Sequence, residues 1–220
     1  MKTFQLTLKL ATPFFCKERL TLDALLSAAV FNATGLMGEE TAAHIPLARE
    51  DGIFKGSSYF CPNTYRHVNV GRVMSLKSER DLSPELFKPQ MRGDKYGHVD
   101  QKRGEYKSNL DSYPGFSAKE IYFWGVGDPE KTANLIRNFI PGIGKRCNAG
   151  AGEIVDVLVF ETDDDYSWKT ERGDPARPLP VAIWEKIGGR ADIPTTPLAI
   201  SFPSWGAPCV DVVFPMSLVA

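Results

Sequence analysis

Residues 139–153 carry the residue types that most plainly suggest binding chemistry in this sequence. They read F-I-P-G-I-G-K-R-C-N-A-G-A-G-E, which places two cations, Lys145 and Arg146, among four glycines. Glycine can adopt a positive φ and lets another molecule approach the backbone without a Cβ clash. Successive backbone N–H groups turned to one side form an anion-binding concavity, and the two cations would add charge to it. This glycine loop is therefore typical of a phosphate-binding site.

The glycine loop fits neither common motif for a bound nucleotide. A P-loop requires G-x-x-x-x-G-K-[ST], but Arg146 follows Lys145 here. The dinucleotide motif requires G-x-G-x-x-G between a strand and a helix, whereas Gly142 and Gly144 are followed by Cys147 and come after a helical pattern. These mismatches favour a loop that lies on the backbone of an RNA polymer over a site for a single small ligand.

The region between Lys55 and Lys107 is a second candidate, because its charge differs from that of the rest of the chain. It contains eleven Lys and Arg against six Asp and Glu, a surplus of +5 (11 − 6), while the whole chain has a net charge of −1. Segregated positive charge is typical of nucleic-acid binders, although a solvated surface loop has the same composition. The tyrosines of this region suit either base stacking or the packing of a β-hairpin. They are Tyr59, Tyr65, Tyr96 and Tyr106.

Residues for hydrolysis or metal binding are sparse. The three histidines are isolated from one another, and the four cysteines include no C-x-x-C pair. We therefore predict no zinc site, no disulfide framework and no cofactor. We also assign no catalytic residue, although an isolated histidine, His44, His67 or His98, could act as the general base of a ribonuclease.

Apolar periodicity predicts two units in which a strand and a helix are neighbours. Residues 3–10 alternate Phe and Leu with polar residues, and Thr21 offers an N-cap hydroxyl to the helix that follows. Residues 119–126 form a second strand, and Asp128 with Pro129 then marks the start of a second helix. A third strand, at 154–160, follows the glycine loop, which therefore connects a helix to a strand.

The middle of the chain has only short strand-like pieces, at 52–61 and 65–74, and residues 88–112 have the composition of a polar loop. With the flanking strands and helices, this order fits the β-α-β-β-α-β plan of ferredoxin-like folds, which RRM-type RNA-binding domains share. We therefore predict an α+β fold with a ferredoxin-like (RRM-like) core, a glycine-rich loop and a basic insertion in the middle.

The end of the chain differs from this core. Residues 163–180 are rich in acids and proline, as in a connector, and short strands are expected at 181–187, 197–203 and 209–215. These pieces predict a small C-terminal β extension. The predicted domains are residues 1–160, with the basic insertion at about 36–112, and residues 161–220.

Two stretches of this sequence resemble the RAMP superfamily of CRISPR-associated proteins. They are L-T-L-D-A-L-L-S-A-A-V after the first strand and G-I-G-K-R-C-N-A-G-A-G-E-I-V after the second helix. The resemblance covers about residues 3–31 and 119–160, and it is nearest to the subunit that holds the 5′ handle of the guide RNA in type IV effector complexes. It implies a ferredoxin-like ribonucleoprotein subunit whose partners are the guide RNA (crRNA), a filament-forming backbone subunit and a large subunit. Target nucleic acid would be met only through the complex.

The resemblance implies that the glycine loop contacts the guide-RNA backbone and a neighbouring subunit. Cations between Lys55 and Lys107, here called the basic segment, would bind phosphates of the RNA. Such contacts make the affinity depend on salt and discriminate little between RNA sequences. Gly152, next to the strand, is expected to serve packing, and apolar residues around Phe202, Trp205 and Val210 are expected to dock a subunit. The candidate RNA-binding residues are Gly142, Gly144, Lys145, Arg146, Asn148, Gly150, Arg66, His67, Arg72, Lys77, Arg92, Lys95, Lys102 and Arg103.

The most consistent hypothesis is a non-catalytic RNA-binding subunit, with two alternatives open. Some RAMP proteins cleave precursor guide RNA, so a metal-independent endoribonuclease is one. A stand-alone RRM-like regulator is the other, although residues 154–160 lack the aromatic RNP1 pattern. The longest apolar run, residues 24–31, is far short of the about 20 residues of a membrane span, and the N-terminus lacks the features of a signal peptide. We therefore expect a cytoplasmic protein with no membrane contact.

Overall fold

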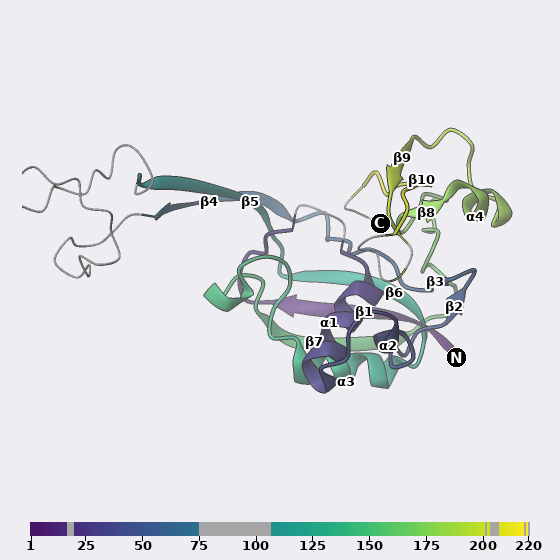
Figure 1. Ribbon diagram of the computed structural model, residues 1–220, viewed down its shortest axis with the longest axis horizontal. Helices are drawn as coiled ribbons and strands as arrows, with labels where there is room; N and C mark the ends of the chain where they lie inside the picture. The colour runs from purple at the N-terminus through teal and green to yellow at the C-terminus, as the bar shows by residue number, and fades with distance from the viewer. Residues whose placement is uncertain (17–19, 75–106, 201, 203–206, 218, 220) are drawn as a thin grey trace, which may run out of the picture. The chain divides into compact units, whose positions relative to one another are not determined.

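The computed structural model describes residues 1–16, 20–74, 107–200, 202, 207–217 and 219 (Figure 1). In this part the chain is α+β, with several small sheets and few helices. It divides into two compact units, Met1–Val68 with Gly115–Ala220, and Asn69–Pro114. Several residues considered above lie outside the described residues: Lys77, Arg92, Lys95, Tyr96, His98, Lys102, Arg103, Tyr106 and Trp205.

The described part of the larger unit centres on an antiparallel sheet of three strands (Figure 1). They are β1 (Lys2–Leu10), β6 (Glu120–Gly127) and β7 (Ile154–Glu161), in the order β6-β1-β7. Alternate side chains of β1 point into the main hydrophobic core, and Leu6 and Leu8 are fully buried. These strands confirm the three that apolar periodicity predicts in the two strand–helix units.

Two helices, α1 (Leu22–Thr34) and α3 (Pro129–Phe139), pack against each other and against this sheet. Both are confirmed where the sequence predicts them. α1 ends at Gly35, whose φ of +76° is left-handed backbone that glycine adopts without strain. At the start of α3, the Asp128 carboxylate accepts a hydrogen bond of 3.1 Å from the backbone N–H three residues later. Thr21 precedes α1 as expected, but its side chain makes no capping hydrogen bond.

The segment between α1 and the hairpin described next holds only short elements. They are α2 (Glu39–Ala42), β2 (Arg49–Glu50) and β3 (Ile53–Phe54). Residues 56–60 then run along β6 through isolated bridges, with Phe60 and Tyr122 exchanging two backbone hydrogen bonds of 2.8 Å. The strand-like piece expected at 52–61 is thus divided into β3 and a row of bridges.

A hairpin of β4 (Arg66–Met74) and β5 (Asn109–Ser117) joins the two compact units in the sequence. β4 confirms the strand-like piece expected at 65–74. β5 corrects the expectation of a polar loop up to residue 112, because its first residues are already a strand. Its sequence N-L-D-S-Y-P-G-F-S is poor in strand-favouring residues, so pairing with β4, and not local propensity, determines its conformation.

The C-terminal part forms a second small sheet in the order β8-β10-β9. Its strands are β8 (Leu179–Pro180), β9 (Thr195–Leu198) and β10 (Val210–Val213). The strand expected at 181–187 is wrong, because this segment is the helix α4 (Val181–Lys186). Helical spacing buries Trp184, whose indole N–H donates a hydrogen bond of 2.8 Å to the carbonyl oxygen of Arg190. Val, Ile and Trp favour strands locally, and this tertiary contact outweighs that preference.

A buried ion pair links the segment before β8 to the core. The Arg177 guanidinium donates to the Asp23 carboxylate at 2.9 Å and to the backbone carbonyls of Phe54 and Gly56 at 2.7 and 3.0 Å. Arg177 and Asp23 are 4% and 7% exposed, respectively. The pair therefore holds together α1, the end of β3 with the residues that follow it, and the C-terminal part of the chain.

Candidate nucleic-acid interface

The glycine loop leaves α3 and closes on itself before β7 begins. The Ile143 amide donates to the Gly152 carbonyl at 2.9 Å, and the Ile154 amide donates to the Pro141 carbonyl at 3.0 Å. Between these two bonds the chain makes a single 3₁₀ turn at Cys147–Ala149. Backbone hydrogen bonds therefore close the loop, and its glycines do not form an extended segment.

Two of its glycines are required by close backbone packing. Gly144 has a φ of +85°, and a Cβ there would lie 2.6 Å from the Phe15 carbonyl oxygen. Gly152 has a φ of +63°, and a Cβ there would overlap the carbonyl oxygen of Ile143. Both positions thus demand glycine for conformation and for space. Gly150 differs, since its φ is +80° but nothing lies within 4 Å of its Cβ position.

The amide groups in the second half of the loop already have acceptors. Those of residues 149 to 152 donate to the carbonyls of Arg146, Cys147, Arg146 and Pro13, in that order, over 2.8–3.2 Å. The Glu153 amide donates to the Thr12 hydroxyl at 3.0 Å. This half of the loop therefore does not supply the amide concavity that the glycines suggest. Anion binding in the loop must rest on its cationic side chains and its first half.

Lys145 and Arg146 lie at the turn that the packed glycines hold in place. The Lys145 amide donates to the Phe15 carbonyl at 2.7 Å, while its side chain is exposed. Arg146 is half-buried and has a φ of +67°, an uncommon conformation for a residue with a Cβ. The thiol of Cys147 donates to the Gly144 carbonyl at 3.0 Å, and burial raises the pKa of this thiol. Asn148 is exposed beside them.

Arg66 and His67 are both exposed, at the first residues of β4. The His67 ring lies 5.1 Å from the ring of Phe116 in β5 and 5.5 Å from that of Tyr65, measured between centroids. Phe116 in turn exchanges two backbone hydrogen bonds, of 2.8 and 2.9 Å, with Phe14. The base of the hairpin is therefore fastened to the segment that follows β1.

Residues 11–16 connect the two groups of candidates. Phe15 forms a bridge with Lys145 in the glycine loop, and its neighbour Phe14 forms a bridge with Phe116 beside His67. Through this segment, the structure links the loop candidates with Arg66 and His67 within the larger unit. This connecting segment carries little signal in the sequence beyond two consecutive phenylalanines after a strand-breaking proline, so its role is not predicted.

For the six other candidate cations of the basic segment, the structure gives no side-chain position. Arg72 belongs to β4 in the smaller unit, and the structure describes its backbone but not its side chain. The remaining five lie outside the described residues, as stated above. Tyr59 is 2% exposed and packs in the core, so it is not available for base stacking, whereas Tyr65 is half-buried.

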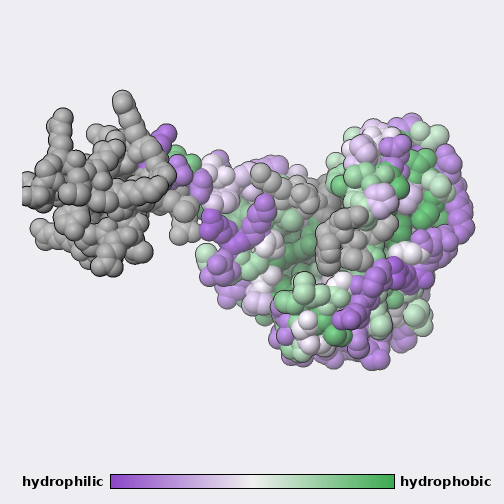
Figure 2. All heavy atoms as spheres, viewed as in Figure 1, coloured by the Kyte–Doolittle hydropathy of each residue, from purple (hydrophilic) through white to green (hydrophobic). Residues whose placement is uncertain are grey.

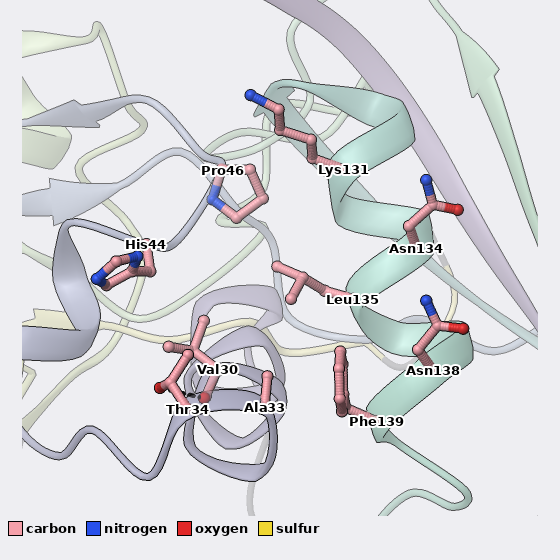
Figure 3. Close-up of a pocket in the computed structure, with 10 residues that line it drawn as sticks. All are labelled: Val30, Ala33, Thr34, His44, Pro46, Lys131, Asn134, Leu135, Asn138 and Phe139. Carbon is pink, nitrogen blue, oxygen red and sulfur yellow. Dashed lines mark hydrogen bonds between the residues drawn. The ribbon is translucent and has the colours of Figure 1, made fainter.

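A groove of about 360 Å³ lies elsewhere, between α1 and α3 (Figure 3). Leu135 and Phe139 of α3 face Val30 and Ala33 of α1 across it, and Lys131 lies at its rim. None of the residues that line this groove is among the predicted binding residues. In the described part of the chain, no group of three or more His, Cys, Asp or Glu is arranged to hold a metal ion. None of the four cysteines is joined in a disulfide.

The described helices include none with the length and apolar character needed to cross a membrane. A search of curated proteins found no match to this sequence. A family model described as CRISPR type IV associated protein Csf3 matches residues 62–187. These 126 residues (187 − 62 + 1) of 220 include the base of the hairpin, α3, the glycine loop and β7. The match confirms the type IV CRISPR resemblance, and the chain belongs to the family of the CRISPR type IV associated protein Csf3.

Proposed function

We propose that this protein is a non-catalytic RNA-binding subunit of a type IV CRISPR effector complex and holds the 5′ handle of the guide RNA. The observation that carries the proposal is the chain of contacts from Lys145 through residues 11–16 to His67. These contacts link Lys145 and Arg146 with Arg66 and His67 within one compact unit. We infer that a single RNA strand contacts both pairs.

The arrangement of the central sheet supports a ferredoxin-like core for this subunit. The order β6-β1-β7 with residues 56–60 beside β6, and α1 and α3 packed together on the sheet, is the order expected for a β-α-β-β-α-β plan. Within this proposal, residues 1–160 form the RAMP domain with its basic insertion at about 36–112, and residues 161–220 form the extension. RNA-binding domains of the RRM type share this plan.

The backbone of Arg146 supports a functional role for the loop. A left-handed residue with a Cβ costs roughly 1–2 kcal/mol relative to glycine. Residues with strained backbone conformations are concentrated at functional sites such as active sites and ligand-binding sites. A loop that served packing alone would be more stable with a fourth left-handed glycine at this position, in addition to Gly144, Gly150 and Gly152. The arginine side chain therefore fits a phosphate contact, to which the basic segment adds further cations.

The subunit contacts of the proposal fall on the C-terminal sheet. Leu198, Val210 and Met216 are 37%, 40% and 69% exposed, which is high for apolar side chains. Figure 2 shows apolar residues at the surface near this sheet, among hydrophilic ones. Exposed apolar residues bordered by polar ones are typical of protein interfaces. We assign this surface to the filament-forming backbone subunit or the large subunit, through which the protein meets target nucleic acid.

The proposal is tested by removing the two loop cations. The double variant Lys145→Ala/Arg146→Ala should weaken binding of a guide RNA that carries the repeat-derived 5′ handle. Affinity falls with salt, and each lost phosphate contact makes the slope of log affinity against log salt concentration less negative by about 0.7. Loss of both contacts should therefore make it less negative by about 1.4 (2 × 0.7). Binding is measured by filter retention at several salt concentrations, with the purified protein and with the assembled complex.

A matched control removes the same charge elsewhere. Lys186 and Arg190 are exposed residues of the C-terminal part, and they pair with Asp51 and Asp192 at 2.7 and 3.0 Å, respectively. Lys186→Ala/Arg190→Ala should leave both affinity and salt slope unchanged. If the two double variants lower RNA affinity and change the salt slope equally, the loop cations do not bind RNA and the loop serves only packing. Cleavage of the RNA in the same reactions, lost in His67→Ala, would instead identify an endoribonuclease.

A further inference from the structure

A row of aromatic rings runs from the core to the surface at the proposed interface. Tyr59 and Phe14 are 2% and 0% exposed, and their ring centroids are 5.4 Å apart. Phe14 lies 5.7 Å from Phe116, which lies 5.1 Å from His67. Tyr65 flanks the outer end, at 5.5 Å from His67. The inner rings are buried, whereas the His67 ring is exposed.

The row is held by the backbone on both sides. Phe14 and Phe116 exchange two backbone hydrogen bonds, and the Tyr59 amide donates to the Leu20 carbonyl at 3.0 Å. Gly115 lies so close to the Phe15 ring that a Cβ there would overlap it. The outer rings therefore stand on a rigid base, and little conformational entropy remains to be lost when another ring is added.

We propose that one unpaired base of the guide RNA stacks on the outer end of this aromatic row, against His67 and Tyr65. The inference rests on the proposed RNA-binding function and names the residues that hold a base. Every nucleobase has a π-face, so the site accepts any of the four. Arg66, next to His67 and exposed, and Lys145, linked through Phe15, bind the phosphates on either side.

The composition of the site favours a nucleic acid over a protein as its occupant. Proteins bind single-stranded nucleic acids with aromatic residues, on which the bases stack, and with Lys and Arg, which neutralise the charge of the phosphate backbone. Protein interfaces are also enriched in aromatic residues and Arg, but they are depleted in Lys, and Lys145 is linked to this site through Phe15. Arg66 precedes His67 in β4, so a cation and an exposed ring are adjacent in the chain at the outer end of the aromatic row.

The test uses a series of RNAs with the repeat-derived 5′ handle, each carrying one abasic nucleotide. With the unaltered protein, one position should lose about 5- to 150-fold in affinity, the range measured for a single base stacked on an aromatic residue. The variant His67→Ala should bind intact RNA more weakly by a similar factor and lose nothing further at that abasic position. His67→Phe keeps an aromatic ring. It should therefore bind intact RNA as tightly as the unaltered protein does and lose affinity at the same abasic position. Thermal unfolding of both variants controls for folding.

The outcomes separate this inference from the function on which it rests. A protein that binds the RNA, but with the same affinity for every abasic RNA, overturns the stacking site and leaves the function in place. Equal abasic losses in the unaltered protein and in His67→Ala do the same. No binding of any handle RNA overturns both. If His67→Ala prevents assembly with the backbone subunit while RNA affinity is unchanged, the surface is a protein interface and the stacking site is wrong.

Discussion

Replacing Gly152 by alanine should destabilise the protein far more than the same replacement of Gly150, although both glycines lie in one loop. Their backbones are alike, with φ of +63° and +80°. Their surroundings differ, because a Cβ on Gly152 would overlap the Ile143 carbonyl oxygen and lie 3.0 Å from the Cβ of Phe14. Nothing lies within 4 Å of the corresponding position on Gly150. The pair therefore separates the cost of conformation from the cost of packing.

The difference between the two variants can be worked from these contacts. A left-handed alanine costs about 1–2 kcal/mol at either position. At Gly152 the backbone must also move, which breaks the bonds from the Ile143 amide (2.9 Å) and to the Pro13 carbonyl (2.9 Å). Each such bond contributes about 1 kcal/mol. We expect losses of about 1–2 kcal/mol for Gly150→Ala and about 3–4 kcal/mol for Gly152→Ala.

The assay is urea unfolding followed by circular dichroism, with thermal unfolding as a second measure. In a chain of this length, 1 kcal/mol corresponds to about 2–4 °C in Tm, so Gly152→Ala should lower Tm by about 6–16 °C. The free energy of unfolding should differ by about 2 kcal/mol between the two variants. Equal losses would refute the argument that Gly152 is required by contact with Ile143 and the segment after β1.

Two further predictions concern groups outside the loop. Arg177→Met should cost about 3–5 kcal/mol, because it leaves the buried Asp23 carboxylate unpaired, and Asp23→Leu/Arg177→Met should recover most of this loss in urea unfolding. Burial, followed by the hydrogen bond to Glu120, raises the pKa of Tyr122 from 10.0 to about 12. A raised pKa means that the folded state holds this proton more tightly, so the stability it contributes is present below pH 10 and is lost as pH rises toward 12. Tyr122→Phe should show a smaller loss of stability over that interval, and an unchanged loss would contradict the assignment.

The elements that the sequence predicts correctly are those with local signals. α3 begins with Asp128 and Pro129, which cap a helix whatever the rest of the chain does. β1 alternates so regularly that its buried face can be read from four residues. The glycine loop is recognisable because its composition is unusual, and Gly152 proves to be the packing residue that its place beside a strand suggests.

The elements that the sequence fails to predict depend on distant partners. α4 reads as a strand, and burial of Trp184 makes it a helix. β5 contains Asn, Asp, Pro and Gly, and exists because β4 pairs with it. The link between the loop and the hairpin base rests on Phe15 and Lys145, which are 130 positions apart (145 − 15). No local pattern reports such a contact, so the candidates could be identified individually but not as one site.

The central claim is that this protein holds the 5′ handle of a guide RNA, and photo-crosslinking tests it most directly. The assembled type IV complex is prepared with RNAs that carry 4-thiouridine at single handle positions, and crosslinked peptides are identified by mass spectrometry. We expect handle positions to crosslink to peptides of this chain that contain residues 65–67 and 142–150. Crosslinks from every handle position to other subunits, with none to this chain, would contradict it.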